Sequence, residues 1–299
     1  GEIDLLLYKG TGSILEQEKS IGEIIEIDNA SKGNIFSRIK KEINLWTKVR
    51  SKKYNYAFFL TTQWRVVPIS WAIGKAKKSA VDDKKRRKSL WTKSFSVIFP
   101  EALDNHIIQR NLSALKSLEL KVFNEDLMLD PVPLEQEYKI LSDSFPFLNQ
   151  DNGYCLIHPT SRREKKLWDK EKFGELISLL GKKNFSVVIT SGPDLHEIGY
   201  VEEILKNADI VDEQVLNLAG KTSLLGLAAL ISRSKFFIGL DSVASHIAAS
   251  VNKDSITLFG PSNPNNWKPW SNRAKVIVRD DLKNIEVGDV ISLVEEMYP

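Results

Sequence analysis

Short apolar runs alternate along the chain with segments whose apolar positions recur every three or four residues. The short runs are rich in β-branched and aromatic residues, which favours buried strands, and the longer periodic segments predict helices. The clearest helix follows Asp169, a candidate N-cap, and ends at Gly181. Its apolar face is formed by Phe173, Leu176, Ile177 and Leu180.

Strands and helices are expected in an alternating order. Strands are expected at residues 3–8, 24–27, 57–60, 154–157, 185–190, 215–218, 236–239, 255–259 and 276–278. Helices are expected at residues 35–49, 103–118, 170–180, 194–206, 222–232, 242–250 and 287–297. This alternation predicts an α/β fold, in which helices cover both faces of a parallel sheet.

Residues 124–146 separate two regions of this kind. They contain Pro131, Pro133 and Pro146 among mixed polar residues, which favours a linker. We therefore expect two domains, residues 1–145 and residues 146–299, with a ligand bound in the cleft between them at the carboxyl ends of the strands. The chain begins with glycine and opens directly on an apolar strand, so we also expect part of the N-terminal domain to precede it.

Composition narrows the class of protein. The chain has 299 residues, 42% of them hydrophobic, which is enough to bury a large core. Its one cysteine, Cys155, excludes an internal disulfide and fits a reducing compartment. No apolar run approaches the roughly 20 residues that a membrane-spanning helix needs. We expect a cytoplasmic protein.

Positive charge is concentrated in residues 32–93. The net charge of the chain is +3, yet this stretch holds 18 lysines and arginines against three acids. It includes the basic run from Lys84 to Lys88. Such a stretch attracts phosphates, acidic lipid surfaces or nucleic acid, with a solvated face as the simpler alternative.

The loop after the strand at 154–157 is a candidate anion site. Hydroxyl groups and cations directly after a strand can neutralise a diphosphate leaving group. The hydroxyls belong to Thr160 and Ser161, and the cations to Arg162 and Lys166. A solvated basic loop is the alternative.

The loop after the strand at 236–239 leads into a helix rich in small residues. The backbone N–H groups of Ser242, Val243 and Ala244 would face an anion at the start of this helix. Asp241 and His246 flank that point, unless they serve only as a cap and a buried core histidine. Residues 259–270 would form the adjoining wall.

Two further loops carry weaker signals. Asp194 and Glu197 could bind ribose hydroxyls, although Asp194 fits a helix cap equally well. Residues 220–222, Gly-Lys-Thr, resemble part of a phosphate-binding loop, but that motif needs glycine at position 215, where the chain has valine. Capping of the next helix by Thr222 or Ser223 is the simpler interpretation.

Two adjoining motifs resemble glycosyltransferase family 9, the lipopolysaccharide heptosyltransferases. They are Asp-Ser-x-x-Ser-His-x-Ala-Ala at 241–249 and Leu-Phe-Gly-Pro-Ser-x-Pro-x-x-Trp-x-Pro-Trp at 258–270. Residues 159–173 and 218–222 extend the resemblance. Residues 60–64, 91–95 and 110–113 are most similar to the heptosyltransferase III branch, which adds a side-chain heptose to the inner core.

The resemblance implies a GT-B enzyme with two Rossmann-like, doubly wound domains that face a cleft. It implies that the C-terminal domain binds the donor, ADP-L-glycero-D-manno-heptose. The residues carried over are Thr160, Ser161 and Lys166 at the diphosphate, Asp241 at the heptose hydroxyls, Ser242 with the following amides at the phosphate, and His246 lining the site. The general base of the family is an Asp after the first N-terminal strand, which would lie upstream of Gly1, so the base is unassigned.

The expected reaction is a single inverting displacement by an acceptor hydroxyl as ADP departs, with Lys166 and the helix start stabilising the leaving group. No metal or other cofactor is expected, since no His, Cys or carboxylate cluster has metal-ligand spacing. The acceptor would be the lipopolysaccharide inner core. Residues 32–93 would make peripheral contact with the anionic inner face of the inner membrane.

Three alternatives belong to other classes. One is a different GT-B nucleotide-sugar enzyme, either an epimerase, which would consume donor without acceptor, or a transferase of another sugar. The second is a nucleic-acid-binding protein that uses the basic stretch with Trp64, Trp71 and Trp91 as stacking surfaces. It leaves the polar loops unexplained, so no nucleic-acid partner is expected. A dinucleotide dehydrogenase is disfavoured because no strand leads into Gly-x-Gly-x-x-Gly.

Overall fold

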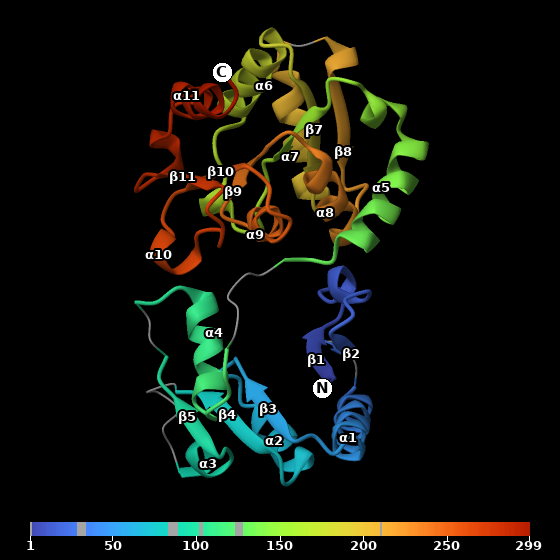
Figure 1. The fold of residues 1–299 in the computed structure, drawn as a ribbon, viewed down its shortest axis with the longest axis vertical. Helices are drawn as coiled ribbons and strands as arrows, with labels where there is room; N and C mark the ends of the chain where they lie inside the picture. The colour runs from blue at the N-terminus through green and yellow to red at the C-terminus, as the bar shows by residue number, and fades with distance from the viewer. Residues whose placement is uncertain (1, 29–33, 83–88, 102–103, 123–127, 210) are drawn as a thin grey trace. The chain divides into compact units, whose positions relative to one another are not determined.

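The structure is a computed structural model that describes residues 2–28, 34–82, 89–101, 104–122, 128–209 and 211–299. Contacts divide the chain into two compact units (Figure 1). The small unit is Asp28–Asp126, and the large unit combines Gly1–Ile27 with Leu127–Pro299. This division differs from the expected boundary at residues 145 and 146, because helix α5 (Pro131–Ser144) packs on helix α8 (Leu224–Arg233) of the large unit.

The large unit is built on a six-stranded parallel sheet in the order β11-β10-β9-β6-β7-β8. The strands are β6 (Tyr154–His158), β7 (Ser186–Ser191), β8 (Val215–Ala219), β9 (Phe237–Leu240), β10 (Ser255–Phe259) and β11 (Ala274–Val278). Strands β6, β9 and β10 are buried along their whole length, which explains their apolar sequences. The order reverses between β6 and β9, so this is the point where a doubly wound sheet opens a crevice for a ligand.

Helices cover both faces of this sheet, as the alternating pattern predicts (Figure 1). On one face, α6 (Lys170–Lys182), α7 (Leu195–Lys206) and α11 (Val287–Met297) contribute to one apolar cluster. On the other face, α5, α8 and α9 (Val243–Ser250) contribute to a second cluster. Short 3-10 turns lie at η3 (Pro146–Asn149), η4 (Glu164–Lys166), η5 (Asp212–Gln214) and η6 (Leu282–Asn284).

Strands β1 (Ile3–Tyr8) and β2 (Ile21–Ile27) form a separate parallel pair. Between them lies η1 (Ser13–Leu15), and Ile14 packs against the cluster under α5 and α8. The segment is also tied to the start of α5, because the Asp130 N–H donates to Glu18 Oε1 at 2.8 Å and Lys19 pairs with Asp130 at 3.1 Å.

The small unit contains a three-stranded parallel sheet in the order β3-β4-β5. Its strands are β3 (Tyr56–Phe59), β4 (Lys77–Val81) and β5 (Val97–Phe99), and its helices are α1 (Ile35–Ser51), α2 (Val66–Ile73), α3 (Ser89–Lys93) and α4 (Ile107–Lys116). Trp91 is fully buried in an aromatic cluster with Trp64 and Phe95. The basic run at residues 84–88 lies outside the described residues.

One expectation from proline positions is wrong. The expected linker contains α5, because Pro131 occupies the first turn, where a missing N–H costs nothing, and the Asp130 side chain accepts from the Val132 N–H at 3.0 Å. Residues 259–270 likewise include a short helix, α10 (Pro264–Trp267), which also begins with proline. Within the described residues, no helix is both long enough and apolar enough to cross a membrane.

Candidate active site

The reversal of strand order brings the two strongest polar loops of the large unit together. Strands β6 and β9 are direct neighbours, and His158 pairs with Gly239 near their carboxyl ends. A Cβ atom on Gly239 would lie 3.2 Å from the His158 carbonyl oxygen and 2.5 Å from the buried Phe237 ring. Glycine at this position therefore allows the close approach of the strands, from which the loops carrying Lys166 and Asp241 emerge.

Lys166 and Asp241 form an ion pair across this crevice. Lys166 Nζ donates to Asp241 Oδ2 at 2.5 Å, although the residues are 75 positions apart. The side chains are only 19% and 8% exposed, so the pair is shielded from much of the solvent. An ammonium group has three N–H donors and a carboxylate has several lone pairs, so both groups can still bind a ligand while they hold each other.

The start of α9 lies directly after Asp241. Ser242 is the N-cap residue of α9, but its side chain does not cap the helix. Its Oγ atom is buried and, among the described residues, has no hydrogen-bond partner. Buried polar groups are normally paired, so this hydroxyl and the free N–H groups of the first helical turn are suited to an anionic ligand.

A partly buried chain of hydrogen bonds connects the loops after β6 and β7. Thr160 Oγ1 donates to Glu197 Oε2 at 2.6 Å, and Glu197 also accepts from the Gly192 N–H at 2.9 Å. His158 lies behind them, with Nε2 3.4 Å from Thr160 Oγ1 and Nδ1 3.0 Å from Thr190 Oγ1. Thr160 donates its single hydroxyl proton to the Glu197 carboxylate, so its oxygen can only accept from His158. This is consistent with a neutral His158 that carries its proton on Nε2.

The remaining predicted site residues lie in the same two loops with different exposure. Ser161 is half-buried and Arg162 is exposed, beyond the buried Thr160. Ala244 is buried and Val243 is exposed, so these two residues offer an anion their backbone rather than their side chains. His246 is half-buried on the second turn of α9. The structure thus places Lys166 in contact with Asp241, directly before the α9 start, and leaves Arg162 exposed to solvent.

Sequence reasoning missed the structural role of Glu197 and His158. Glu197 was considered only as a ribose ligand, and its contact with Thr160 depends on the pairing of β6 with β7. The sequence signal was only the glycine at position 192, and the structure shows its reason, because a Cβ atom there would come within 2.9 Å of the Glu197 carboxylate. Thr160 consequently links two loops instead of presenting a free hydroxyl.

The capping interpretations of the weaker loops are confirmed. The Asp194 side chain accepts from the His196 N–H at 2.8 Å and begins α7. Ser223 accepts from the Gly226 N–H at 2.9 Å and begins α8. Within the described ranges, no group of three or more His, Cys, Asp or Glu residues is arranged to hold a metal ion.

We expect His158 to make the protein less stable in mild acid. Burial lowers the pKa of His158 from 6.5 to about 4, whereas the unfolded chain takes up the proton near 6.5. The unfolded state therefore binds more protons between these values, and stability is lost as pH falls from 6.5 towards 4. The loss between pH 7 and pH 5 should be about 2 kcal/mol by linkage.

Urea unfolding of the wild type and of His158→Gln at the two pH values measures this effect. The variant should be less stable at pH 7 but show a shallower pH dependence. An equal slope in both proteins would assign the acid sensitivity to other groups.

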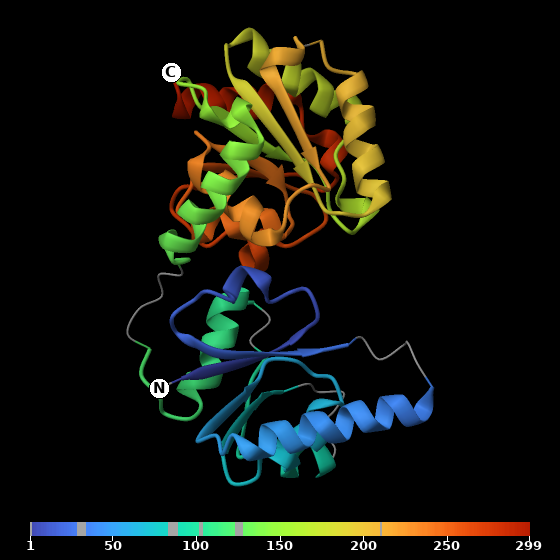
Figure 2. The same ribbon diagram turned by 90° about the vertical axis from the view of Figure 1, so that its right-hand side faces the viewer.

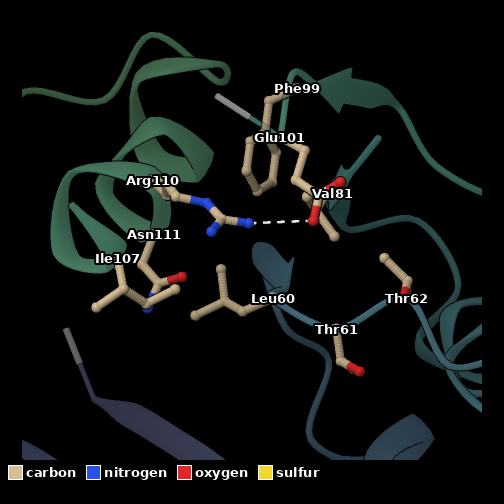
Figure 3. Close-up of a pocket in the computed structure, with 9 residues that line it drawn as sticks. All are labelled: Leu60, Thr61, Thr62, Val81, Phe99, Glu101, Ile107, Arg110 and Asn111. Carbon is tan, nitrogen blue, oxygen red and sulfur yellow. Dashed lines mark hydrogen bonds and ion pairs between the residues drawn. The ribbon is translucent and has the colours of Figure 1, made fainter. Parts of the chain in front are cut away.

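A pocket in the small unit lies at the carboxyl ends of β3, β4 and β5 (Figure 3). Its volume is about 230 Å³. Its polar lining consists of Thr61, Thr62, Glu101, Arg110 and Asn111. The Arg110 guanidinium points towards Glu101 and pairs with it at 3.1 Å, so the pocket holds a neutralised cation beside an amide and two hydroxyls.

Comparison with known proteins identifies the family. Residues 43–291 match glycosyltransferase family 9 (heptosyltransferase). The chain is 32% identical over 314 residues to lipopolysaccharide heptosyltransferase 3 of Escherichia coli K12, an alignment that covers 100% of this chain and 90% of that protein.

Solved structures show the same fold. A glycosyltransferase family 9 protein from Veillonella parvula aligns with a TM-score of 0.81 at 19% identity, over 99% of this chain and 88% of that chain. Escherichia coli ADP-heptose lps heptosyltransferase II aligns with a TM-score of 0.80 at 19% identity, over 99% and 89% of the two chains. The expected α/β, GT-B fold is confirmed, and the chain belongs to glycosyltransferase family 9, the heptosyltransferases, and is a glycosyltransferase.

Proposed function

We propose that this protein transfers heptose from ADP-L-glycero-D-manno-heptose to the inner core of lipopolysaccharide. Membership of the heptosyltransferase family supports the sugar, and the name of the 32% identical relative supports the acceptor. The observation in this chain that carries the proposal is the Lys166–Asp241 pair beside the start of α9. A sugar nucleotide needs both parts of this arrangement. Its diphosphate requires cations and N–H donors, and its sugar requires a group that accepts hydrogen bonds from the sugar hydroxyls.

The proposed donor pose assigns one role to each group. Lys166 donates to a diphosphate oxygen while it keeps its bond to Asp241, and Asp241 accepts from a heptose hydroxyl. The Ser242 hydroxyl and the N–H groups of Val243 and Ala244 donate to the second phosphate. Ser161 and Arg162 lie at the outer end of the same loop, where they bind the donor from the solvent side, and His246 lines the site.

The proposed chemical step is a single displacement with inversion. The acceptor hydroxyl oxygen forms a bond to the anomeric carbon as the bond from that carbon to the diphosphate oxygen breaks. The electron pair leaves with ADP, and the hydroxyl proton passes to a general base, to which no described residue is assigned. Negative charge grows on the diphosphate, so Lys166 and the positive end of the α9 dipole stabilise the transition state more than the ground state. We propose that these groups replace a metal ion.

We propose the small unit as the acceptor side of the enzyme. Its pocket combines hydroxyls, an amide and the Glu101–Arg110 pair, which together suit the hydroxyls and acidic groups of a core sugar. Most of its described lysines and arginines in the stretch 32–93 are exposed, and we propose that this stretch makes peripheral contact with the anionic inner face of the inner membrane.

Replacing Arg110 with alanine should raise the KM for the lipopolysaccharide acceptor about tenfold, the cost of one charge-assisted hydrogen bond. The Kd for ADP-heptose should stay unchanged, because the pocket belongs to the small unit. Lys116→Ala is the matched control, since Lys116 is an exposed cation on the same helix. Equal effects of the two changes on the KM for the acceptor would show that the pocket is not part of the acceptor site.

The overall proposal is tested by measuring binding and transfer separately. Calorimetric titration should show binding of ADP-heptose in preference to UDP-N-acetylglucosamine, and mass spectrometry should show one heptose added to a heptose-deficient lipopolysaccharide acceptor. Transfer should persist in EDTA. Consumption of donor without acceptor would favour an epimerase, and salt-sensitive RNA binding without nucleotide-sugar affinity would favour a nucleic-acid-binding protein.

A further inference from the structure

The loop between β6 and α6, which carries Lys166, is held at both ends by other segments of the large unit. At its first end Thr160 is buried and donates to Glu197 on α7 at 2.6 Å. At its second end Trp168 is only 1% exposed. Residues 162–165 between these ends are exposed. Lys166 therefore projects from an exposed turn whose position depends on two buried ends.

Trp168 is fixed through its ring and through its backbone. Its indole Nε1 donates to the Ile285 carbonyl oxygen at 3.1 Å, and its ring packs edge-on against Phe173 with 4.8 Å between the ring centroids. Its own carbonyl oxygen accepts a hydrogen bond from the Tyr200 hydroxyl. Since Trp168 follows Lys166 by two residues, a shift of this carbonyl would also shift the backbone that carries the lysine.

Helix α7 supplies the side chains that hold both ends of the loop. Glu197 and Tyr200 are three positions apart on this helix and therefore share one side of it. The helix packs on strands β7 and β8 and on helix α6 (Figure 2). A helix that is itself fixed to the sheet can hold the loop in one position relative to β9, from which the Asp241 loop emerges.

The Tyr200 hydroxyl differs from other buried hydroxyls in the segment that it holds. Tyr154 is the comparison, because its buried hydroxyl donates to the Leu230 carbonyl oxygen of α8 at 2.7 Å and fixes only a core helix. Tyr200 is 7% exposed, and burial raises the pKa of its phenol, so it remains a neutral donor at working pH. Its acceptor belongs to the loop of Lys166.

We infer that Tyr200 is a positioning residue, whose bond to the Trp168 carbonyl oxygen holds the turn that aims the Lys166 ammonium group. The inference rests on the proposed function, in which Lys166 compensates the charge of the diphosphate, and it adds the residue that keeps this charge in place. A preorganised charge acts only from the correct position, and a misplacement of about 1 Å can cost about 10²-fold in rate. Without the hydroxyl, the buried carbonyl loses its donor, which favours movement of the turn towards water.

Tyr200→Phe tests the inference, because it keeps the ring and removes only the hydroxyl. The kcat/KM for heptose transfer should fall about tenfold, and the Kd for ADP should rise by a similar factor. Tyr154→Phe is the matched control, since it removes a hydroxyl of the same kind from the same unit. Urea unfolding should show comparable losses of stability in the two variants, but transfer and ADP affinity should stay within about twofold of wild type in the control.

Combining Tyr200→Phe with Lys166→Ala separates positioning from a general structural role. If Tyr200 acts through Lys166, its removal should change neither kcat/KM nor the Kd for ADP by more than about twofold once the lysine is absent. A structural role would lower both by the same factor with and without Lys166. Equal factors in the two backgrounds would overturn the inference, as would wild-type transfer and ADP affinity in Tyr200→Phe.

A donor placed at the same ring position provides a second variant. With 4-aminophenylalanine in place of Tyr200, an N–H group replaces the hydroxyl, so the protein remains testable where the phenylalanine variant unfolds. Its transfer rate should lie between those of wild type and Tyr200→Phe, and its deficit should also depend on Lys166. A deficit as large as that of Tyr200→Phe would contradict the role of the hydrogen bond.

The ADP titrations distinguish this inference from the proposed function. A wild-type protein that transferred no heptose to lipopolysaccharide would refute the proposed reaction. The dependence of the Tyr200 effect on Lys166 in ADP affinity would still decide the inference. Normal transfer by the wild type, with independent effects of the two changes, would overturn the positioning role alone.

Discussion

Replacing Lys166 with alanine should lower kcat/KM for heptose transfer about 10²- to 10³-fold, the usual effect of removing one preorganised charge partner from a developing anion. Lys166 lies in a partly shielded crevice, where its 2.5 Å bond to Asp241 fixes the ammonium group before the donor arrives. The barrier rises because this charge must compensate the diphosphate as the anomeric bond breaks. Binding of ADP and of ADP-heptose should weaken together, since both carry the diphosphate.

The matched control for Lys166→Ala is Lys165→Ala. Lys165 is the preceding residue in the same 3-10 turn and is exposed. Steady-state transfer rates and calorimetric Kd values for ADP and ADP-heptose should be unchanged in this control within about twofold. Because loss of Lys166 leaves a nearly buried carboxylate without its cation, unfolding should be measured as well. If the two lysine variants behaved alike, the leaving-group role would belong to another residue.

Replacing Asp241 with alanine should separate the sugar from the nucleotide. Affinity for ADP-heptose should fall about 10- to 100-fold, because the carboxylate would no longer accept from a sugar hydroxyl. Affinity for ADP should be retained or increased, since Lys166 no longer shares its charge with a carboxylate. The ratio of the two Kd values is therefore the decisive quantity, because it should change for Asp241→Ala and stay nearly unchanged for Lys166→Ala.

Two further variants define the role of Asp241. Asp241→Asn keeps the shape and one acceptor oxygen but removes the charge, so it should retain part of the preference for ADP-heptose over ADP. Asp280→Ala removes an exposed carboxylate from the loop after β11 of the same unit and should have no effect on either Kd. Equal weakening of ADP and ADP-heptose by Asp241→Ala would place this residue at the phosphate and contradict the proposed pose.

The single changes Lys166→Ala and Asp241→Ala also probe the ion pair itself. Breaking a shielded pair from one side leaves the other charge uncompensated, so each single change includes a reorganisation cost. The double change Lys166→Ala and Asp241→Ala removes both charges and should be less damaging to stability than the sum of the single changes. This comparison separates loss of ligand contacts from damage to the folded site.

Local sequence pattern determined most of the large unit. Strands β1 and β10 and helix α11 have the bounds expected from the sequence, the other strands of the six-stranded sheet differ by one or two residues, and β2 begins three residues earlier than expected. These elements are buried on one face or both, so their apolar spacing carries the signal. The small unit was less predictable. Strand β4 begins with two lysines and β5 has three residues, so neither shows an apolar run long enough to be recognised.

The residue types in the sequence identified Lys166 and the α9 start, flanked by Asp241, as groups suited to an anion, because residue types and positions after apolar strands are local properties. The resemblance to the family added the sugar. Only the tertiary structure decided that they meet. That contact depends on β9 pairing with β6 rather than with β8, and the periodicity of a strand does not encode its neighbour. Assembly of the same sheet brings Thr160 to Glu197 and, among the described residues, leaves the Ser242 hydroxyl without a partner, because hydrogen bonds between distant segments form only after the sheet has assembled.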